Sequence, residues 1–278
     1  MHGDKPGLIE MFRPEIAKSA ASAAITWLRP HGANAIIKPK RIFPAAPVLG
    51  RIGALEVRLA QSKGDVKRAQ KLRYKVFYKD GNAIADAATM LAQRDEDSFD
   101  KICDHLMVVD HAAKPSLSGK QPVVGTYRLL QQTIADHHGG FYTGHEFDIS
   151  GLMQRQRGLK FLELGRSCVL PQYRTKRTVE LLWHGVWSYV RRYQFDVMIG
   201  CASFEGTDPR TLALPLSFLH HFARAPDGWQ ARAHSSRRVD MNMMAKDATP
   251  STPRLRCARC RRSSKAICGS ARSSATAR

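Results

Sequence analysis

Two charged side chains interrupt an apolar stretch near the middle of the chain. In the sequence FLELGRSCVLPQYR, residues 161–174, Glu163 and Arg166 stand among residues that are typical of a buried strand. A charge inside such a strand costs several kcal/mol unless it is paired or lines a cavity. A carboxylate that lines a cavity can accept a proton, and a guanidinium can hold an anion. We therefore expect Glu163 and Arg166 either to pair with opposite charges or to line a cavity.

Three other segments carry charges that an apolar core does not need. They are Arg73 in LRYKVF, the D-x-x-D pair Asp97 and Asp100 in RDEDSFDK, and Arg128 in VVGTYRLL. Each charge alone is consistent with a solvated surface or an ordinary ion pair. Together with the strand at 161–170, they can gather two carboxylates and two or three guanidinium groups in one place. The pattern favours a charge network at a functional site.

The elements that must position these residues follow from the periodicity of the apolar residues. The run at 196–204 is apolar throughout, which is typical of a strand covered on both faces. Strands are predicted at 55–60, 105–110, 122–131, 161–170, 196–204 and 237–244, helices at 65–79 and 178–194, and a broken helix at 211–223. This order predicts an α/β fold with a mixed, partly antiparallel sheet flanked by helices. The same order argues against a doubly wound nucleotide-binding fold, and neither G-x-G-x-x-G nor G-x-x-x-x-G-K-[ST] occurs.

Composition divides the chain into three parts. Residues 1–50 are rich in proline and predict an irregular leader with one short helix at 15–28. The regular pattern occupies 51–248 and predicts one domain. Residues 249–278 are basic, contain no Asp or Glu and have no periodicity, which predicts a disordered tail. GC-rich codons can be chosen for 256–272 so that a shifted frame reads as an ordinary amphipathic sequence, and we therefore interpret the tail as frameshifted.

Four stretches carry a family resemblance. In this order and spacing, LRYKVF, DSFD, VVGTYRLL and LELGRS resemble the acyl-homoserine-lactone synthases, a branch of the GNAT acyltransferase fold. A fuller match from Gly50 to Ala245, carried by LGRIGALEVRLA, LRYKVFY and LGRSCV, resembles the hemolysin-like GNAT family of L-ornithine N-alpha-acyltransferases. The Trp that lactone synthases have after the residue corresponding to Phe77 is missing, which argues against a homoserine-lactone product.

The resemblance implies a GNAT-like fold and an acyl transfer. It implies that a 3-hydroxyacyl chain moves from acyl carrier protein to the α-amine of L-ornithine, giving lyso-ornithine lipid, with no bound cofactor. In this reaction Glu163 is the expected general base, directly or through water, with Arg166 as its ion-pair partner. Backbone N–H groups near Ser167 are expected to bind the oxyanion, and we assign all three residues to catalysis.

The same resemblance assigns the substrate-binding residues. They are Arg73, Phe77, Asp97, Asp100 and Arg128. The two aspartates suit the δ-ammonium group of ornithine, and either arginine suits its carboxylate, because charge-assisted hydrogen bonds are the strong ones.

The turn before the helix at 178–194 departs from the GNAT pattern. The pyrophosphate loop Q/R-x-x-G-x-G/A is half present, since QYRTKRT keeps Gln172 and has no glycine. Close approach of the backbone to a CoA pyrophosphate is therefore not expected. The basic residues Arg174, Lys176 and Arg177 are instead expected to hold the phosphopantetheine and the acidic surface of acyl carrier protein.

The net charge of +20 leaves a non-enzymatic alternative, a basic protein that binds a membrane or nucleic acid. No helix-turn-helix, zinc-finger spacing or aromatic RNA-binding motif is present, so we expect no nucleic-acid partner. No apolar run reaches the roughly 18–20 residues that span a bilayer, and no secretory signal precedes the domain. We expect a cytoplasmic protein in peripheral contact with an anionic membrane. Convergence of the charged residues favours the enzyme, and scattered charges favour the binder.

The six cysteines fall into two groups. Cys103, Cys168 and Cys201 stand singly in apolar surroundings, which is typical of core residues in a reduced protein. The alternative for Cys168 is a thiol nucleophile, although no histidine lies near it in the sequence. The other three lie in the tail and lack a fourth zinc ligand, so we expect no metal: Cys257, Cys260 and Cys268.

Overall fold

The computed structural model describes residues 48–204, 206, 208–239, 241–246 and 249. All of them belong to the compact unit Ala46–Arg278. The helix expected at 15–28 and nearly all of the expected tail lie outside the described residues. Residues 48–50, which we expected in the leader, begin strand β1 (Val48–Ile52), so regular structure starts slightly before the expected boundary.

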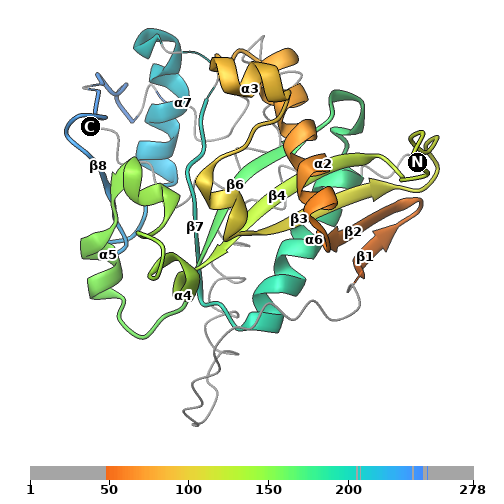
Figure 1. The fold of residues 1–278 in the computed structure, drawn as a ribbon. Helices are drawn as coiled ribbons and strands as arrows, with labels where there is room; N and C mark the ends of the chain where they lie inside the picture. Colours follow the sequence, from red (N-terminus) through yellow and green to blue (C-terminus); the bar gives the residue numbers. More distant parts are fainter. Residues whose placement is uncertain (1–47, 205, 207, 240, 247–248, 250–278) are drawn as a thin grey trace, which may run out of the picture. The chain divides into compact units, whose positions relative to one another are not determined.

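Six strands form one sheet in the order β1-β2-β3-β4-β6-β7 (Figure 1). Neighbouring strands are antiparallel except β6 and β7, which are parallel. The bounds of the strands after β1 are β2 Leu55–Leu59, β3 Asp104–Asp110, β4 Val123–Gln131, β6 Phe161–Val169 and β7 Val197–Ile199. This confirms the predicted α/β class with a mixed, partly antiparallel sheet.

A long helix covers each face of the sheet (Figure 1). On one face, α2 (Lys63–Tyr74) continues as a π-helical turn, η2 (Lys75–Lys79), and packs Ala69 and Leu72 into an apolar cluster with β3 and β4. On the other face, α6 (Lys176–Tyr193) packs Leu182 and Val186 into a second cluster. Each pair is three or four residues apart and so lies on one side of its helix.

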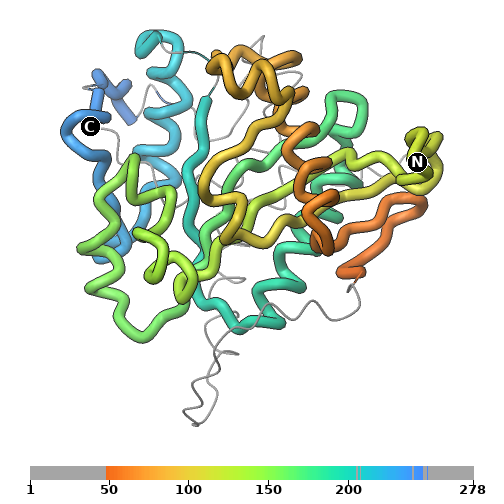
Figure 2. The backbone as a smooth tube through the Cα atoms, in the orientation of Figure 1, coloured from red at the N-terminus to blue at the C-terminus, as the bar shows by residue number. Residues whose placement is uncertain are grey.

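One further long helix, α7, and several short elements complete the described part of the domain. They are α3 (Ala87–Ala92), η3 (Ser98–Lys101), α4 (Gln132–Ala135), η4 (Tyr142–His145), β5 (Phe147–Asp148), α5 (Ser150–Arg155), η5 (Pro171–Tyr173), α7 (Pro209–Phe222) and β8 (Arg232–Ala233). β5 and β8 pair as a separate two-stranded sheet. The chain descends from α3 through η3 to the start of β3, and Figure 2 traces this path.

Three predictions about the last third of the chain need correction. The run at 196–204 forms a strand only at Val197–Ile199. The helix expected to break at 211–223 is continuous in α7 and carries Pro215 inside it. The strand predicted at 237–244 is wrong, because the described residues of this segment form none. Its end lies instead against α7, where the Met244 N–H donates to the Ser217 hydroxyl at 2.8 Å.

Candidate active site

Strand β6 changes course at the position where its charged residues lie. The parallel ladder to β7 ends at the pair Glu163 and Ile199, although β6 continues to Val169. Against β4, the residues between Gly165 and Cys168 outnumber those facing them by one, which is a β-bulge. Arg166 in this bulge has φ +50°, a left-handed conformation that is uncommon for a residue other than glycine. The bulge adds one residue to β6 and turns Arg166 out of the ladder with β4, which continues on both sides of it.

Glu163 is buried and anchors the turn η4. Its carboxylate accepts hydrogen bonds from the backbone N–H of Tyr142 at 3.0 Å and from the backbone N–H and hydroxyl of Thr143, both at 2.6 Å. The expected pairing of Glu163 with Arg166 is not what the structure has, because Arg166 binds Asp95 and Asp97 instead. The link between them is Tyr142, whose ring lies 5.6 Å from the Arg166 guanidinium.

Arg73 of helix α2 is the most deeply buried arginine of a charge network. Its guanidinium donates to Asp95 and to Asp100, both at 2.7 Å, and also to the backbone carbonyl of Asp95. Gln70, one helical turn earlier, donates to Asp100 at 3.0 Å. The two carboxylates and the backbone carbonyl offset much of the cost of burying this charge, while the Arg73 Nη1 has no hydrogen-bond partner among the described residues.

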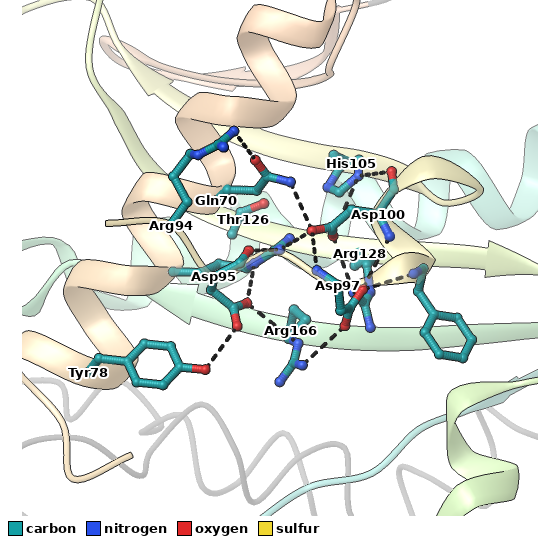
Figure 3. Close-up of polar contacts among 12 residues, drawn as sticks. Gln70, Tyr78, Arg94, Asp95, Asp97, Asp100, His105, Thr126, Arg128 and Arg166 are labelled. Carbon is teal, nitrogen blue, oxygen red and sulfur yellow. Dashed lines mark hydrogen bonds and ion pairs between the residues drawn. The ribbon is translucent and has the colours of Figure 1, made fainter. Parts of the chain in front are cut away.

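The strands β4 and β6 supply the other two arginines of this network (Figure 3). Arg128 donates to Asp97 at 2.6 Å and to Asp100 at 3.2 Å. Arg166 donates to Asp97 at 3.1 Å, and its Nε lies 3.5 Å from Asp95. The network therefore balances three guanidinium groups against three carboxylates, which lowers the free-energy cost of burying them.

The short helix η3 holds the two carboxylates of the D-x-x-D motif. Asp97 caps this helix by accepting from the N–H groups of Phe99 and Asp100, and Asp100 accepts from the N–H of Asp97 in return. Such a reciprocal cap fixes both side chains at the start of the helix. The three-residue spacing read from the sequence thus has a structural cause.

The guanidinium groups of the network hold the carboxyls of Asp97 and Asp100 in the ionised form. Burial raises the pKa of the Asp100 carboxyl, but the charge and hydrogen bond of Arg73, together with the Gln70 hydrogen bond, outweigh it and lower the pKa to about 2. Burial opposes ionisation of Asp97 as well, and the hydrogen bond and charge of Arg128 bring its pKa below the usual range. His105 is also buried, which lowers its pKa, so its imidazole is neutral at physiological pH and binds the Asp100 backbone carbonyl at 3.0 Å.

Exposure divides the expected substrate-binding residues. Arg73 and Arg128 are 1% and 4% exposed, and Asp100 is 5% exposed, so all three contact the protein rather than solvent. The side chains of Asp97 and Arg166 are 25% and 29% exposed and form the accessible edge of the network. Phe77 is half-buried and packs against the apolar cluster under α2. This geometry favours a positioning role for the buried residues and direct contact with a substrate for Asp97 and Arg166.

Sequence reasoning missed two parts of this site. Asp95 binds Arg73 and Arg166 and also accepts from the Tyr78 hydroxyl at 3.2 Å, yet it was not singled out. Its signal was present in RDEDSFD, where it stands two residues before Asp97. The donors to Glu163 in η4 had no signal, because backbone N–H groups are present at every residue except proline.

The described cysteines suit structural roles. Cys103 and Cys168 are buried and Cys201 is half-buried. Burial raises the pKa of Cys168 to about 12, so its thiol is protonated at neutral pH and is a poor nucleophile. The described residues contain no group of three or more His, Cys, Asp or Glu side chains placed to hold a metal ion.

The basic turn after β6 lies at the surface. Arg174, Lys176 and Arg177 are all exposed, and Lys176 forms a weak helical pair with Glu180 at 3.6 Å. Thr175 caps α6 by accepting from the Thr178 N–H at 3.3 Å. The turn is therefore ordered by its own cap, while its cations are accessible to a partner. Over the described residues, every helix is too short or too polar to span a bilayer.

Comparison with known proteins identifies similar sequences over most of the chain. Residues 72–184, which contain every candidate site residue, match the family described as Acetyltransferase (GNAT) domain. The chain is 50% identical over 203 residues to the L-ornithine N(alpha)-acyltransferase of Brucella abortus (strain 2308), covering 73% of this chain and 72% of that protein. It is 47% identical over 215 residues to the enzyme of the same name from Rhizobium meliloti (strain 1021), covering 77% and 72%.

Among solved structures, the chain is similar to FeeM, an N-acyl amino acid synthase from uncultured soil microbes. The TM-score is 0.37 at 11% identity, covering 52% of this chain and 70% of that one.

Proposed function

From the premise that this chain belongs to the L-ornithine N(alpha)-acyltransferase family, we propose that it acylates the α-amine of L-ornithine. The proposed donor is a 3-hydroxyacyl thioester of acyl carrier protein, and the product is lyso-ornithine lipid. The amine attacks the thioester carbonyl carbon, a C–N bond forms, the C–S bond breaks, and the carrier protein leaves as its thiol. The 50% identity over 203 residues is the observation that carries this proposal.

Glu163 is the proposed general base. A carboxylate offers about four acceptor sites, and Glu163 uses three for the donors of Tyr142 and Thr143. The remaining site can take the ammonium proton of ornithine directly or through a water molecule. The hydrogen bonds from η4 fix the orientation of the carboxylate during this step.

The bulge in β6 is the proposed oxyanion site. A tetrahedral intermediate places negative charge on the former carbonyl oxygen, which backbone N–H groups stabilise when they point at it. The ladder to β7 ends at Glu163, so the bulge residues Arg166 and Ser167 have no partner in β7. We assign the oxyanion to N–H groups near Ser167, with the thioester lying along this free edge.

The charge network is proposed to position the accessible edge for ornithine. Asp97 is assigned to the δ-ammonium group and Arg166 to the α-carboxylate, since both side chains reach the surface. The buried members of the network hold Asp97 and Arg166 in place: they are Arg73, Arg128 and Asp100. Phe77, which lies in the apolar cluster beneath α2, is assigned to packing around the site.

The positive charge at the start of α6 supports the proposed acyl donor and cellular location. The exposed cations Arg174, Lys176 and Arg177 at the start of α6 are proposed to bind the phosphopantetheine phosphate and the acidic surface of acyl carrier protein. A single-chain lipid product is amphiphilic, so we propose a cytoplasmic protein in peripheral contact with an anionic membrane.

Thiol release tests the proposal directly. The full chain is incubated with 3-hydroxyacyl carrier protein and a panel of amino acids, and free thiol and product mass are followed. Release that depends on L-ornithine and yields the α-amide is expected. Release that requires another amine, or equal use of acyl-CoA, would overturn the assigned acceptor or donor respectively.

A further inference from the structure

A row of exposed lysines runs along α2 and η2. Lysine recurs at every fourth position over this segment, and each of the five side chains is exposed: Lys63, Lys67, Lys71, Lys75 and Lys79. Residues four apart are neighbours on a helix surface, so the row forms a ridge about 24 Å long at about 1.5 Å per residue. The opposite side of α2 packs on the sheet through Ala69 and Leu72. Packing of the domain therefore does not use these lysines.

Much of the charge on this lysine ridge has no ion-pair partner among the described residues. Lys75 binds Asp80 at 3.2 Å, and Lys79 lies 5.6 Å over the Tyr74 ring. Over the described part of the chain, the first three lysines of the ridge form no ion pair. Like charges four residues apart on a helix destabilise it. An anionic partner along the ridge would remove this repulsion.

Apolar side chains stand in solvent where the chain continues from the ridge. Helix α3 buries none of its residues. Ile84 is 96% exposed, Leu91 is 89% exposed and Met90 is 55% exposed. In Figure 1, α3, which carries Met90 and Leu91, lies beyond the far end of α2. We call Ile84, Met90 and Leu91 the apolar knob. Large apolar side chains beside a row of lysines are typical of a surface that lies in the membrane interface.

Cations also gather at the other end of the ridge. A hollow of about 340 Å³ opens beside the start of α2 and is lined by Arg58, Arg68, His111 and Lys120. Asp65 in the same hollow pairs with the two arginines, which leaves the lining net positive. Its size and charge suit the phosphate of a lipid headgroup.

We propose that the lysine ridge and the apolar knob form the surface by which this protein binds an anionic lipid bilayer. The lysines face the headgroups, and the knob enters the boundary between headgroups and acyl chains. Two acidic residues lie along this segment: Asp80 offsets the charge of Lys75, and Asp86 caps α3 through the Thr89 N–H. The attraction to headgroups is therefore assigned chiefly to the first three lysines of the ridge: Lys63, Lys67 and Lys71.

A bilayer fits this surface better than acyl carrier protein does. The ridge lies on the sheet face opposite α6, whereas the cations assigned to the carrier protein stand at the start of α6. The inference rests on the proposed function in one respect: membrane binding would let the enzyme release its acylated product next to a bilayer. Binding is measured without substrates, so its failure is distinct from a failure of the acyl transfer.

Vesicle sedimentation tests the ridge. The full chain is spun with phosphatidylcholine vesicles with and without phosphatidylglycerol, at low and high salt. The variant K63Q/K67Q/K71Q is expected to lower the partition onto anionic vesicles roughly tenfold or more. The control K160Q/R191Q/R192Q removes the same charge from exposed positions around the end of α6 and is expected to change it less than about twofold. If both variants lost the same share of binding to anionic vesicles, net charge alone would explain the binding and the proposal would be overturned.

The knob and the location are tested separately. The variant I84S/M90S/L91S is expected to weaken partition while leaving its salt dependence intact, because the lysines remain. Hydrogen–deuterium exchange with anionic vesicles should protect 63–92 and leave α6 unchanged. Protection confined to other segments contradicts the proposal. So does a ridge variant that raises the KM for acyl carrier protein in the absence of vesicles, since the ridge would then belong to that partner.

Discussion

At the scale of single residues, Glu163 combines a structural and a proposed catalytic task. It ties η4 to β6 through three hydrogen bonds and has one acceptor site left for a proton. A general base of this kind contributes roughly a hundredfold to ten-thousandfold to the rate. The two tasks are separable, because only the second depends on the negative charge being available to the amine.

We expect Glu163→Gln to lower kcat by about a hundredfold or more, since an amide cannot accept the ammonium proton. Steady-state kinetics with L-ornithine, together with thermal unfolding, measure the effect. Thr143→Ala is the matched control, because it removes one donor to Glu163 and should lower stability by about 1 kcal/mol while keeping most of the turnover. Turnover near that of the parent protein in Glu163→Gln would remove Glu163 from the mechanism.

At the scale of elements, η3 and α2 hold the charge network together. Asp100 of η3 contacts Arg73 of α2 and Arg128 of β4, so it joins three elements at one carboxylate. The lowered pKa of Asp100 measures the free energy by which the folded protein favours the ionised carboxylate. The change from 3.8 to about 2 corresponds to roughly 2 kcal/mol.

The pH dependence of stability follows from this sign. A depressed carboxyl pKa stabilises the folded state above the unfolded value of 3.8, and the contribution is lost as pH falls toward about 2. We expect Asp100→Asn to unfold more easily at pH 7 by about 3 kcal/mol, because two buried guanidiniums lose a partner. Its loss of stability between pH 4 and 2 should be smaller than in the parent chain. Denaturant unfolding across this range measures both effects, and exposed Asp227→Asn is the control.

The contact between β6 and β7 depends on one glycine. A Cβ on Gly200 would lie 2.3 Å from the backbone carbonyl oxygen of Leu164, which cannot move as a side chain does. We expect Gly200→Ala to force the two strands apart at the proposed active site and to lower both the melting temperature and kcat. Gly144→Ala places its methyl in open space and serves as the control. Equal melting temperatures in the two variants would contradict this explanation.

At the scale of the whole molecule, the basic residues divide into surfaces with different proposed partners. We expect R174A/K176A/R177A to raise the KM for acyl carrier protein roughly tenfold and to weaken its salt dependence. The same variant should bind anionic vesicles nearly as the parent does, whereas the lysine-ridge variant should behave in the opposite way. Kinetics and sedimentation on both proteins measure this. Parallel losses in both assays would mean that the cations act only through net charge.

Local patterns in the sequence were sufficient for most of the fold. The period of two in LEVRLA and the helical spacing of Val66, Ala69 and Leu72 identified β2 and α2. Both signals arise within one element, and burial on a single face imposes them. The strand predicted at 237–244 failed because RRVDMNMM alternates like a strand, while pairing needs a neighbour that the sequence does not reveal.

The sequence by itself determined which charged residues are too costly to bury alone, because the free energy of burying a charge depends on the residue type and its apolar neighbours. It therefore identified Arg73, Asp100 and Arg128 as parts of one arrangement. Only the tertiary structure decided their partners, since these lie about 30 residues apart in sequence. Tertiary contacts brought Asp95 into the network and bent β6 at the bulge. They also made the donors of η4, and not Arg166, the partners of Glu163. Such pairings depend on how strands and helices meet in space, which no local pattern encodes.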